Sequence, residues 1–282
     1  MKFLLRYGEI GLKGRHVRGQ MLRSLRDHIG QLLAEDDAQG TVFEEGGRLF
    51  VESEHPNVAE LLGRVFGLVS FSLVQETSAE PKDIAALAVR LAREVRTRGA
   101  SFAVRARRVG NHLFTSTDVA KEVGAVILAQ VPNLEVDLTA PDWEIHVEIR
   151  GEKAYLTTDI LPGVGGLPLG TQGKVVALVE TLEGTLASWL MMKRGCYVLP
   201  VFRGEDSWAT LLGKWDPNIR WRPIESLGEM HDVAEEIGAL GFVYPWTATQ
   251  TPKEDLRPAF YPLMGFESER LADLRATVLR PG

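Results

Sequence analysis

The sequence predicts an α/β protein whose N-terminal half is α+β and whose C-terminal half is a parallel, Rossmann-like sheet. Two patterns carry this prediction. Residues 2–75 read in the order β-α-β-β-α-β, which is the ferredoxin-like unit. Beyond residue 173, apolar strand segments alternate with helical segments, which favours a parallel sheet covered by helices. The 282 residues are 45% hydrophobic, ample for two or three domains with their own cores.

In the predicted ferredoxin-like domain, strand and helix periodicities alternate along the chain. Gly46-Gly47 separates two extended runs and predicts a hairpin. Asn57 precedes a helical apolar stripe and is a candidate N-cap. The predicted strands cover residues 2–7, 41–45, 48–53 and 68–75, and the predicted helices cover residues 15–33 and 57–66. This ferredoxin-like domain is assigned to residues 1–75.

Residues 76–160 predict a second α/β domain. Pro81 suits the first turn of a helix that ends before Gly99. A second helix runs from Asp118 to about Gln130, capped by one of the hydroxyl residues at 115–117. Apolar and polar residues alternate strictly from Trp143 to Arg150, with Glu144, His146, Glu148 and Arg150 on the polar face. Further strands are predicted at 101–109, 134–138 and 153–158.

The stretch from Ser101 to Ser116 is the first candidate for a functional site. Strand periodicity places Phe102, Val104 and Ala106 on one face and Arg105 and Arg107 on the other. Arg108, His112 and Phe114 follow just before the N-terminus of a helix, which offers N–H groups to an anion. Arginines bind phosphate with paired donors, and a ring stacks on a base or fills a core gap. Nucleic-acid contact and a solvated strand edge with protective charges both remain open.

Residues 161–173, LPGVGGLPLGTQG, contain five glycines and two prolines, the composition of a linker. Beyond them the third domain, 174–282, follows. Its predicted strands cover 174–179, 196–202, 219–224 and 240–244. Its predicted helices cover 184–194, about 230–239, and 267–277. Ligands in such sheets bind at the carboxyl ends of the strands.

Charge and cysteine content limit the function classes. The net charge is -6, but the first thirty residues carry seven basic and two acidic side chains, which indicates a basic face on an acidic body. The single cysteine, Cys196, excludes an internal disulfide, suits the cytoplasm and reads as a core residue. The six histidines show no metal-ligand spacing, so no metal site is predicted. No apolar run is long enough to cross a membrane.

Five segments resemble the tRNA 4-thiouridine synthetase family, the tRNA sulfurtransferases also linked to thiamine thiazole synthesis. They are GEIGLKGRHVR, SFAVRARRVGNHLFTSTDVAKEVGA, VDLTAPDWEIHVEIR, GGLPLGTQGKVVAL and WLMMKRG. The resemblance implies a ferredoxin-like domain, an RNA-binding THUMP domain over 76–160, and a shortened PP-loop pyrophosphatase-like domain over 174–282. The resemblance also implies that residues 161–173 form an ordered junction and not a linker. It implies tRNA as the partner, a catalytic or sulfur-donor protein as a second partner, and a homodimer as one option.

The resemblance also assigns candidate residues. Lys13 and Arg15 match its basic N-terminal loop, and four positions match its THUMP cations: Arg105, Arg107, Arg108 and Lys121. These side chains suit backbone phosphates, which position RNA without reading its sequence. The full set of RNA-binding candidates is Lys13, Arg15, Arg105, Arg107, Arg108, His112, Phe114, Lys121 and Lys174.

One departure from the family bears on mechanism. The family's pyrophosphatase signature, Ser-Gly-Gly-x-Asp-Ser, aligns with Val179–Gly184, where both glycines and both serines are replaced. A phosphate cradle needs backbone N–H groups free of Cβ atoms. Glu180 would also bring a like charge near a bound triphosphate. At ~5 Å and an effective dielectric near 20, each unit-charge repulsion costs roughly 3 kcal/mol. The vestigial nucleotide site would comprise Ala177, Leu178, Glu180, Glu183 and Gln250.

Three functional hypotheses follow. In the first, the chain binds tRNA and has lost ATP chemistry, with no catalytic residue and no cofactor. In the second, it is an active sulfurtransferase that uses ATP with Mg²⁺ at an unconventional nucleotide site. In the third, it is a structural or oligomerisation module whose basic face binds an acidic protein surface.

Overall fold

The computed structural model describes residues 1–246 and 257–279. They form two compact units. The first comprises Met1–Arg6, Thr41–Ser53 and Phe71–Leu161. The second comprises Tyr7–Gly40, Glu54–Ser70 and the described part of Pro162–Gly282. Gln250, a candidate for the vestigial nucleotide site, lies outside the described residues.

The N-terminal strands form a sheet in the order β10-β4-β1-β3-β2, with β1 antiparallel to β3, and the predicted β-α-β-β-α-β order is confirmed. Two differences are local. The helix near Asn57 spans only Val58–Gly63, and the Asn57 side chain makes no capping hydrogen bond. The strand predicted to reach Gln75 ends at Leu73, because Gln75–Ser78 pairs with the next sheet. The elements are β1 Lys2–Tyr7, η1 Glu9–Leu12, α1 Arg15–Glu35, β2 Gly40–Glu45, β3 Arg48–Ser53, α2 Val58–Gly63, β4 Leu68–Leu73 and β10 Leu161–Pro162.

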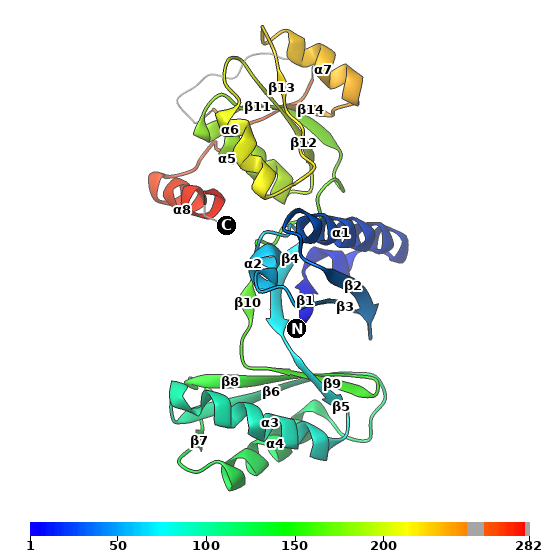
Figure 1. Cartoon of the computed structure of the whole chain (residues 1–282), viewed down its shortest axis with the longest axis vertical. Helices are drawn as coiled ribbons and strands as arrows, with labels where there is room; N and C mark the ends of the chain where they lie inside the picture. Colours follow the sequence, from blue (N-terminus) through cyan, green and yellow to red (C-terminus); the bar gives the residue numbers. More distant parts are fainter. Residues whose placement is uncertain (247–256, 280–282) are drawn as a thin grey trace. The chain divides into compact units, whose positions relative to one another are not determined.

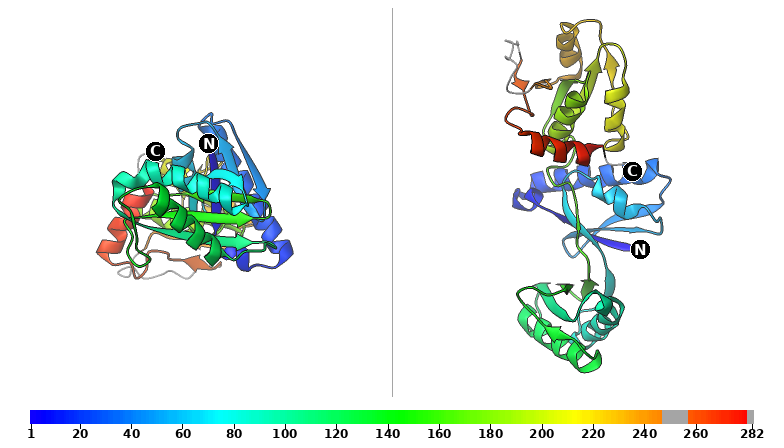
Figure 2. Two further views of the ribbon diagram at one scale, coloured as in Figure 1. Left: turned by 90° about the horizontal axis from the view of Figure 1, so that it is seen from below. Right: turned by 90° about the vertical axis from the view of Figure 1, so that its left-hand side faces the viewer.

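The second sheet has the order β5-β9-β8-β6-β7. Its central strands β6 and β8 are parallel, and β9 returns antiparallel to β8. Helices α3 and α4 cover one face, as Figures 1 and 2 show, and bury the apolar residues of β6 and β8. The elements are β5 Gln75–Ser78, α3 Pro81–Val95, η2 Arg96–Arg98, β6 Ser101–Val109, α4 Ser116–Gln130, β7 Glu135–Val136, β8 Trp143–Arg150 and β9 Lys153–Thr157.

The third sheet is entirely parallel, in the order β13-β12-β11-β14-β15, as the Rossmann-like prediction requires. Alternate residues of β11 pack against α5 and α8 on one face and against α7 on the other. This explains the unbroken apolar run of β11, since a strand buried on both faces has no polar side. The elements are β11 Lys174–Leu178, α5 Leu182–Lys193, β12 Tyr197–Phe202, α6 Ser207–Thr210, η3 Leu211–Lys214, β13 Arg222–Pro223, α7 Glu229–Ile237, β14 Gly241–Val243, β15 Ala259–Phe260 and α8 Ser268–Val278.

Two parts of the third region differ from the sequence prediction. The strand expected over 219–224 is reduced to Arg222–Pro223, and the short elements α6, η3 and β15 were not predicted. Each spans four residues or fewer, too short for an apolar period to develop. No helix among the described residues is long and apolar enough to cross a bilayer.

The glycine-rich segment 163–173 is held in place by backbone hydrogen bonds. Gly163 N and Gly165 N donate to carbonyls of β4, and Gln172 N donates to the carbonyl of Gly195. A Cβ atom at Gly166, where φ is +80°, would collide with the carbonyl of Lys193. The glycines therefore permit close backbone approach, which a flexible linker does not need.

A buried histidine lies among the aromatic rings of the second unit. His28 of α1 stacks on Phe66, and its Nε2 donates to the carbonyl of Trp215 at 2.8 Å. Its Nδ1 is buried without a partner. Burial lowers the pKa of His28, so the ring is neutral at pH 7.

We expect folding stability to fall as the pH drops below about 6.5, because the unfolded chain then takes up a proton that buried His28 refuses. In His28→Phe, this loss between pH 7.5 and 5.5 should be reduced, while stability at pH 7.5 falls by about 1 kcal/mol for the lost hydrogen bond. Urea denaturation at the two pH values measures both effects.

The control for this prediction is Asp216→Asn. Burial raises the pKa of Asp216, so its contribution has the opposite sign and is lost as the pH rises. A pH dependence that persists unchanged in His28→Phe would assign it to another group.

Candidate nucleic-acid interface

Strand β6 presents Arg105 and Arg107 on the face of the second sheet opposite α3 and α4. The Arg105 guanidinium is already engaged. Its Nε donates to Glu144 Oε1 at 2.7 Å, and its Nη2 donates to the carbonyl of Leu138 at 2.9 Å. Arg105 is therefore held in a fixed orientation, with its charge partly neutralised by a neighbour on β8.

Arg107 differs from Arg105 in having no such partner. Its side chain is exposed, and in the described part of the chain it makes no hydrogen bond or ion pair. Burial lowers the pKa of His146 on β8, and the charges of Arg6, Arg105 and Arg107 lower it further. The His146 ring is therefore neutral at pH 7. Because Arg107 makes none of these bonds, all of its N–H donors are available to an external anion.

The turn after β6 brings three of the predicted residues together. Arg108 Nη1 donates to the carbonyl of Gly110 at 2.9 Å and lies 3.5 Å from His112 Nδ1. His112 Nε2 donates to the carbonyl of Gly151 at 2.7 Å. The rings of His112 and Phe114 lie 5.1 Å apart, and Phe114 also packs against the domain core. Phe114 therefore fills a core gap, and His112 fastens the turn.

The N-terminus of α4 is closed by its own side chains. Thr115 Oγ1 accepts from Asp118 N, and Asp118 Oδ2 accepts from Thr115 N at 2.8 Å. Hydrogen bonds from the Thr115 hydroxyl and from Thr115 N lower the pKa of Asp118, so a carboxylate occupies this helix end at neutral pH. The expectation that the helix N-terminus receives an external anion is therefore wrong for these donors. Lys121, one turn further along, is exposed.

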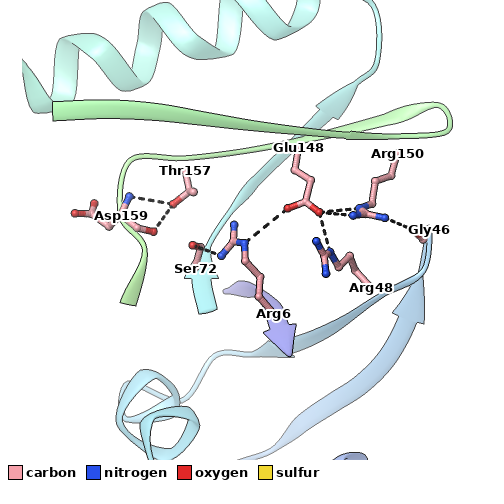
Figure 3. Close-up of polar contacts among 8 residues, drawn as sticks. All are labelled: Arg6, Gly46, Arg48, Ser72, Glu148, Arg150, Thr157 and Asp159. Carbon is pink, nitrogen blue, oxygen red and sulfur yellow. Dashed lines mark hydrogen bonds and ion pairs between the residues drawn. The ribbon is translucent and has the colours of Figure 1, made fainter. Parts of the chain in front are cut away.

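A buried carboxylate links strands of the first unit (Figure 3). Glu148 Oε1 accepts from Arg48 Nε at 2.8 Å and from Arg150 Nη2 at 2.6 Å. Arg6 Nε lies 3.8 Å from Glu148 Oε2, and Arg6 Nη1 donates to Ser72 Oγ. We call Arg6, Arg48, Glu148 and Arg150 the Glu148 cluster.

The polar face of β8 is not uniformly exposed, and Glu148 is its buried member. Its side chain is only 9% exposed. Burial acts to raise its pKa, but the hydrogen bonds and charges of Arg48 and Arg150 outweigh burial and lower it. The polar face of this strand is therefore covered at Glu148 and not wholly solvated. With three guanidiniums around one carboxylate, the cluster keeps a net positive charge.

The other predicted cations lie in the second unit. Lys13 and Arg15 are exposed around the start of α1, and Lys174 is exposed at the start of β11. No local sequence pattern indicates that Arg48 and Glu148 belong to one network, because their contact joins residues one hundred positions apart.

Four residues of the predicted vestigial nucleotide site lie in or beside the turn between β11 and α5: Ala177 and Leu178 end β11, Glu180 is in the turn, and Glu183 is in the first turn of α5. Val179 N already donates to the carbonyl of Val201 at 2.8 Å. Glu180 pairs with Arg203, whose Nη2 lies 2.9 Å away, and Glu183 pairs with Arg275 at 2.7 Å. A Cβ at Gly184 would lie 2.7 Å from the carbonyl oxygen of Leu178. Ala177 and Leu178 are buried.

The Glu180–Arg203 pair changes the electrostatic argument made from sequence. The hydrogen bond from Arg203 lowers the pKa of Glu180, so both partners are charged and largely neutralise each other. Repulsion of a triphosphate by Glu180 is therefore weaker than for a bare carboxylate. The argument against a phosphate cradle therefore depends on the backbone packing around Val179 and Gly184. Cys196 is buried, with its pKa raised by burial, and the described residues contain no group of side chains suited to a metal ion.

Two family models match consecutive parts of the chain. The ThiI ferredoxin-like domain matches residues 2–72, and the THUMP domain matches residues 78–159. The second match contains β6, Arg107 and the turn that follows it.

Named relatives align with more than two thirds of the chain. A protein of Methanosarcina mazei named "Probable tRNA sulfurtransferase" is 38% identical over 212 residues, covering 73% of this chain and 52% of the relative. The tRNA sulfurtransferase of Pyrobaculum aerophilum is 39% identical over 198 residues, covering 69% and 40%. The chain thus spans about half the length of these curated relatives.

Two crystal structures are similar over almost the whole chain. PH1313 from Pyrococcus horikoshii has a TM-score of 0.85 at 30% identity and covers 97% of this chain and 98% of its own. A 4-thiouridine synthetase, crystallised with RNA and bound ATP, has a TM-score of 0.80 at 23% identity over 99% and 86%, and shows a shared fold. The two domain matches and the named relatives together show that this chain belongs to the tRNA sulfurtransferase (4-thiouridine synthetase) family.

Proposed function

We propose that the protein binds tRNA through the turn after β6 and through the part of the second sheet that carries Arg105 and Arg107, on the face opposite α3 and α4. The observation that carries the proposal is Arg107, an exposed guanidinium without a partner in the described chain, on a THUMP domain. Arg105 and Arg108 lie on either side of it in the sequence with their guanidiniums fixed by hydrogen bonds. Fixed and available cations together suit a phosphate backbone, which is recognised by charge and shape.

Fluorescence anisotropy with a labelled tRNA transcript at several salt concentrations tests the proposal. The logarithm of the binding constant should fall steeply and linearly with the logarithm of salt, because each neutralised phosphate releases counterions. A structural module that binds an acidic protein surface predicts no salt-dependent tRNA affinity, so a flat or absent response would favour that function.

We further propose that the third region has lost ATP chemistry and that the chain acts in or beside tRNA thiolation with a catalytic or sulfur-donor protein. Support comes from the turn at 179–184. The N–H of Val179 donates to Val201 of β12, and a Cβ atom at Gly184 would lie only 2.7 Å from the carbonyl oxygen of Leu178, so the backbone there is closely packed. A phosphate cradle needs several adjacent N–H groups pointing at one anion.

Isothermal titration calorimetry with Mg²⁺-ATP should therefore detect no binding tighter than a Kd of about 1 mM, an affinity near 4 kcal/mol. The same titration repeated with saturating tRNA covers a site that RNA completes. Tight Mg²⁺-dependent binding, or ATP consumption that requires tRNA, would instead identify an active sulfurtransferase with an unconventional nucleotide site.

A further inference from the structure

Leu113, in the turn between β6 and α4, is as exposed as a side chain can be. Its relative exposure is 108%, the highest among the exposed large hydrophobic side chains of the described residues. It makes no packing contribution to the core, so the fold does not account for an apolar residue here. Val109, at the end of β6, is a second exposed apolar side chain in this part of the chain.

The turn that carries Leu113 is anchored on both sides. His112, just before it, donates to the carbonyl of Gly151 at 2.7 Å and lies 3.5 Å from Arg108. Phe114, just after it, packs against the core, and Thr115 closes the capping box of α4. Leu113 therefore projects from a pre-formed turn, so ordering this residue on binding requires little conformational entropy.

The chemistry around Leu113 fits one class of ligand. It is an uncharged apolar side chain on the same short segment as Arg107 and Arg108, which suit phosphates. RNA presents phosphates beside apolar base faces, and proteins reach those faces where bases are unstacked, in loops, bulges and single-stranded ends. A fully paired A-form duplex keeps its base faces stacked and inaccessible.

We propose that Leu113 packs against the face of an unstacked nucleobase while Arg107 holds a neighbouring phosphate. This inference rests on the proposed RNA-binding function and deepens it, because it names the part of the RNA that the turn contacts. An apolar contact releases no counterions, so it adds affinity without adding to the salt dependence.

The test compares wild type with Leu113→Ser and Leu113→Trp on two RNAs. One is a tRNA transcript, which has unpaired bases, and the other is a blunt-ended RNA duplex. Leu113→Ser should weaken tRNA binding about fivefold, leave duplex binding unchanged and leave the salt slope unchanged. Leu113→Trp should bind tRNA at least as tightly as wild type, since indole stacks on any base. Leu240→Ser, at another exposed leucine, is the matched control and should bind as wild type does.

The outcomes separate this inference from the function it rests on. If wild type binds tRNA but Leu113→Ser binds it equally well, or weakens both RNAs alike, the nucleobase contact is wrong and RNA binding stands. If wild type binds neither RNA, both proposals fail. Thermal denaturation of each variant checks folding, which a substitution at a fully exposed position leaves intact.

Discussion

Replacing Glu148 by glutamine is expected to lower the free energy of unfolding by about 3 to 5 kcal/mol, the range for breaking a buried ion pair from one side. The carboxylate is 9% exposed and accepts hydrogen bonds from Arg48 and Arg150. A neutral amide leaves these guanidiniums, with Arg6 nearby, close together without their counter-charge. Urea denaturation at pH 7, followed by circular dichroism, measures the loss.

Glu144→Gln is the matched control for Glu148→Gln. Glu144 lies on the same strand and the same face, and it also accepts from an arginine, Arg105. Its side chain is 30% exposed, so its ion pair is screened by water and should contribute no more than about 1 kcal/mol. Equal losses in the two variants would show that burial at Glu148 does not strengthen the cluster.

The same variant should change the acid limb of the stability profile. The pKa of Glu148 in the folded protein lies below its ordinary value of 4.5. Its contribution to stability is therefore present above pH 4.5 and is lost as the pH falls through the folded-state pKa. Wild type should lose stability over this window more steeply than Glu148→Gln, which has no proton to take up at this position.

The prediction succeeded where burial alone decides the local structure. The alternation from Trp143 to Arg150 predicts β8 with both ends correct, because one face of the strand packs against α3. The unbroken apolar run of β11 likewise identifies a strand covered on both faces. Short elements such as β13 depend on two residues pairing with a neighbour and leave no period to read.

The sequence predicts which face of β6 carries the candidate arginines, but it does not predict the hydrogen-bond partners of those arginines. Strand periodicity places Arg105 and Arg107 on one face, but it does not show that Arg105 bonds to Glu144 of β8. The register sets Arg107 opposite Glu148, whose carboxylate accepts hydrogen bonds from Arg48 and Arg150 instead. Glu180 shows the same limit. Its sequence position indicates a repulsive charge, and its neutralisation by Arg203 depends on how β11 and β12 align. Pairing between residues far apart in the chain depends on the fold, so local sequence patterns do not predict it.

Arg107→Glu is expected to weaken tRNA binding about a hundredfold and Arg107→Ala about tenfold. The alanine variant removes charge-assisted hydrogen bonds to one phosphate, and the glutamate variant adds repulsion. Arg107→Ala should also reduce the salt slope by about one, because one fewer counterion is released. Arg105→Ala should have a smaller effect, since the Arg105 guanidinium is already bonded to Glu144.

Arg93→Ala gives the matched control for the loss of charge. Arg93 is also exposed, but it lies on α3, which covers the opposite face of the second sheet. A purely long-range electrostatic effect on RNA binding would make Arg93 and Arg107 nearly equivalent, because both variants change the net charge by one unit. Contact with a phosphate instead depends on position, so a tenfold gap between the two alanine variants is the signature of a binding face. Equal affinities would place the RNA elsewhere on the protein.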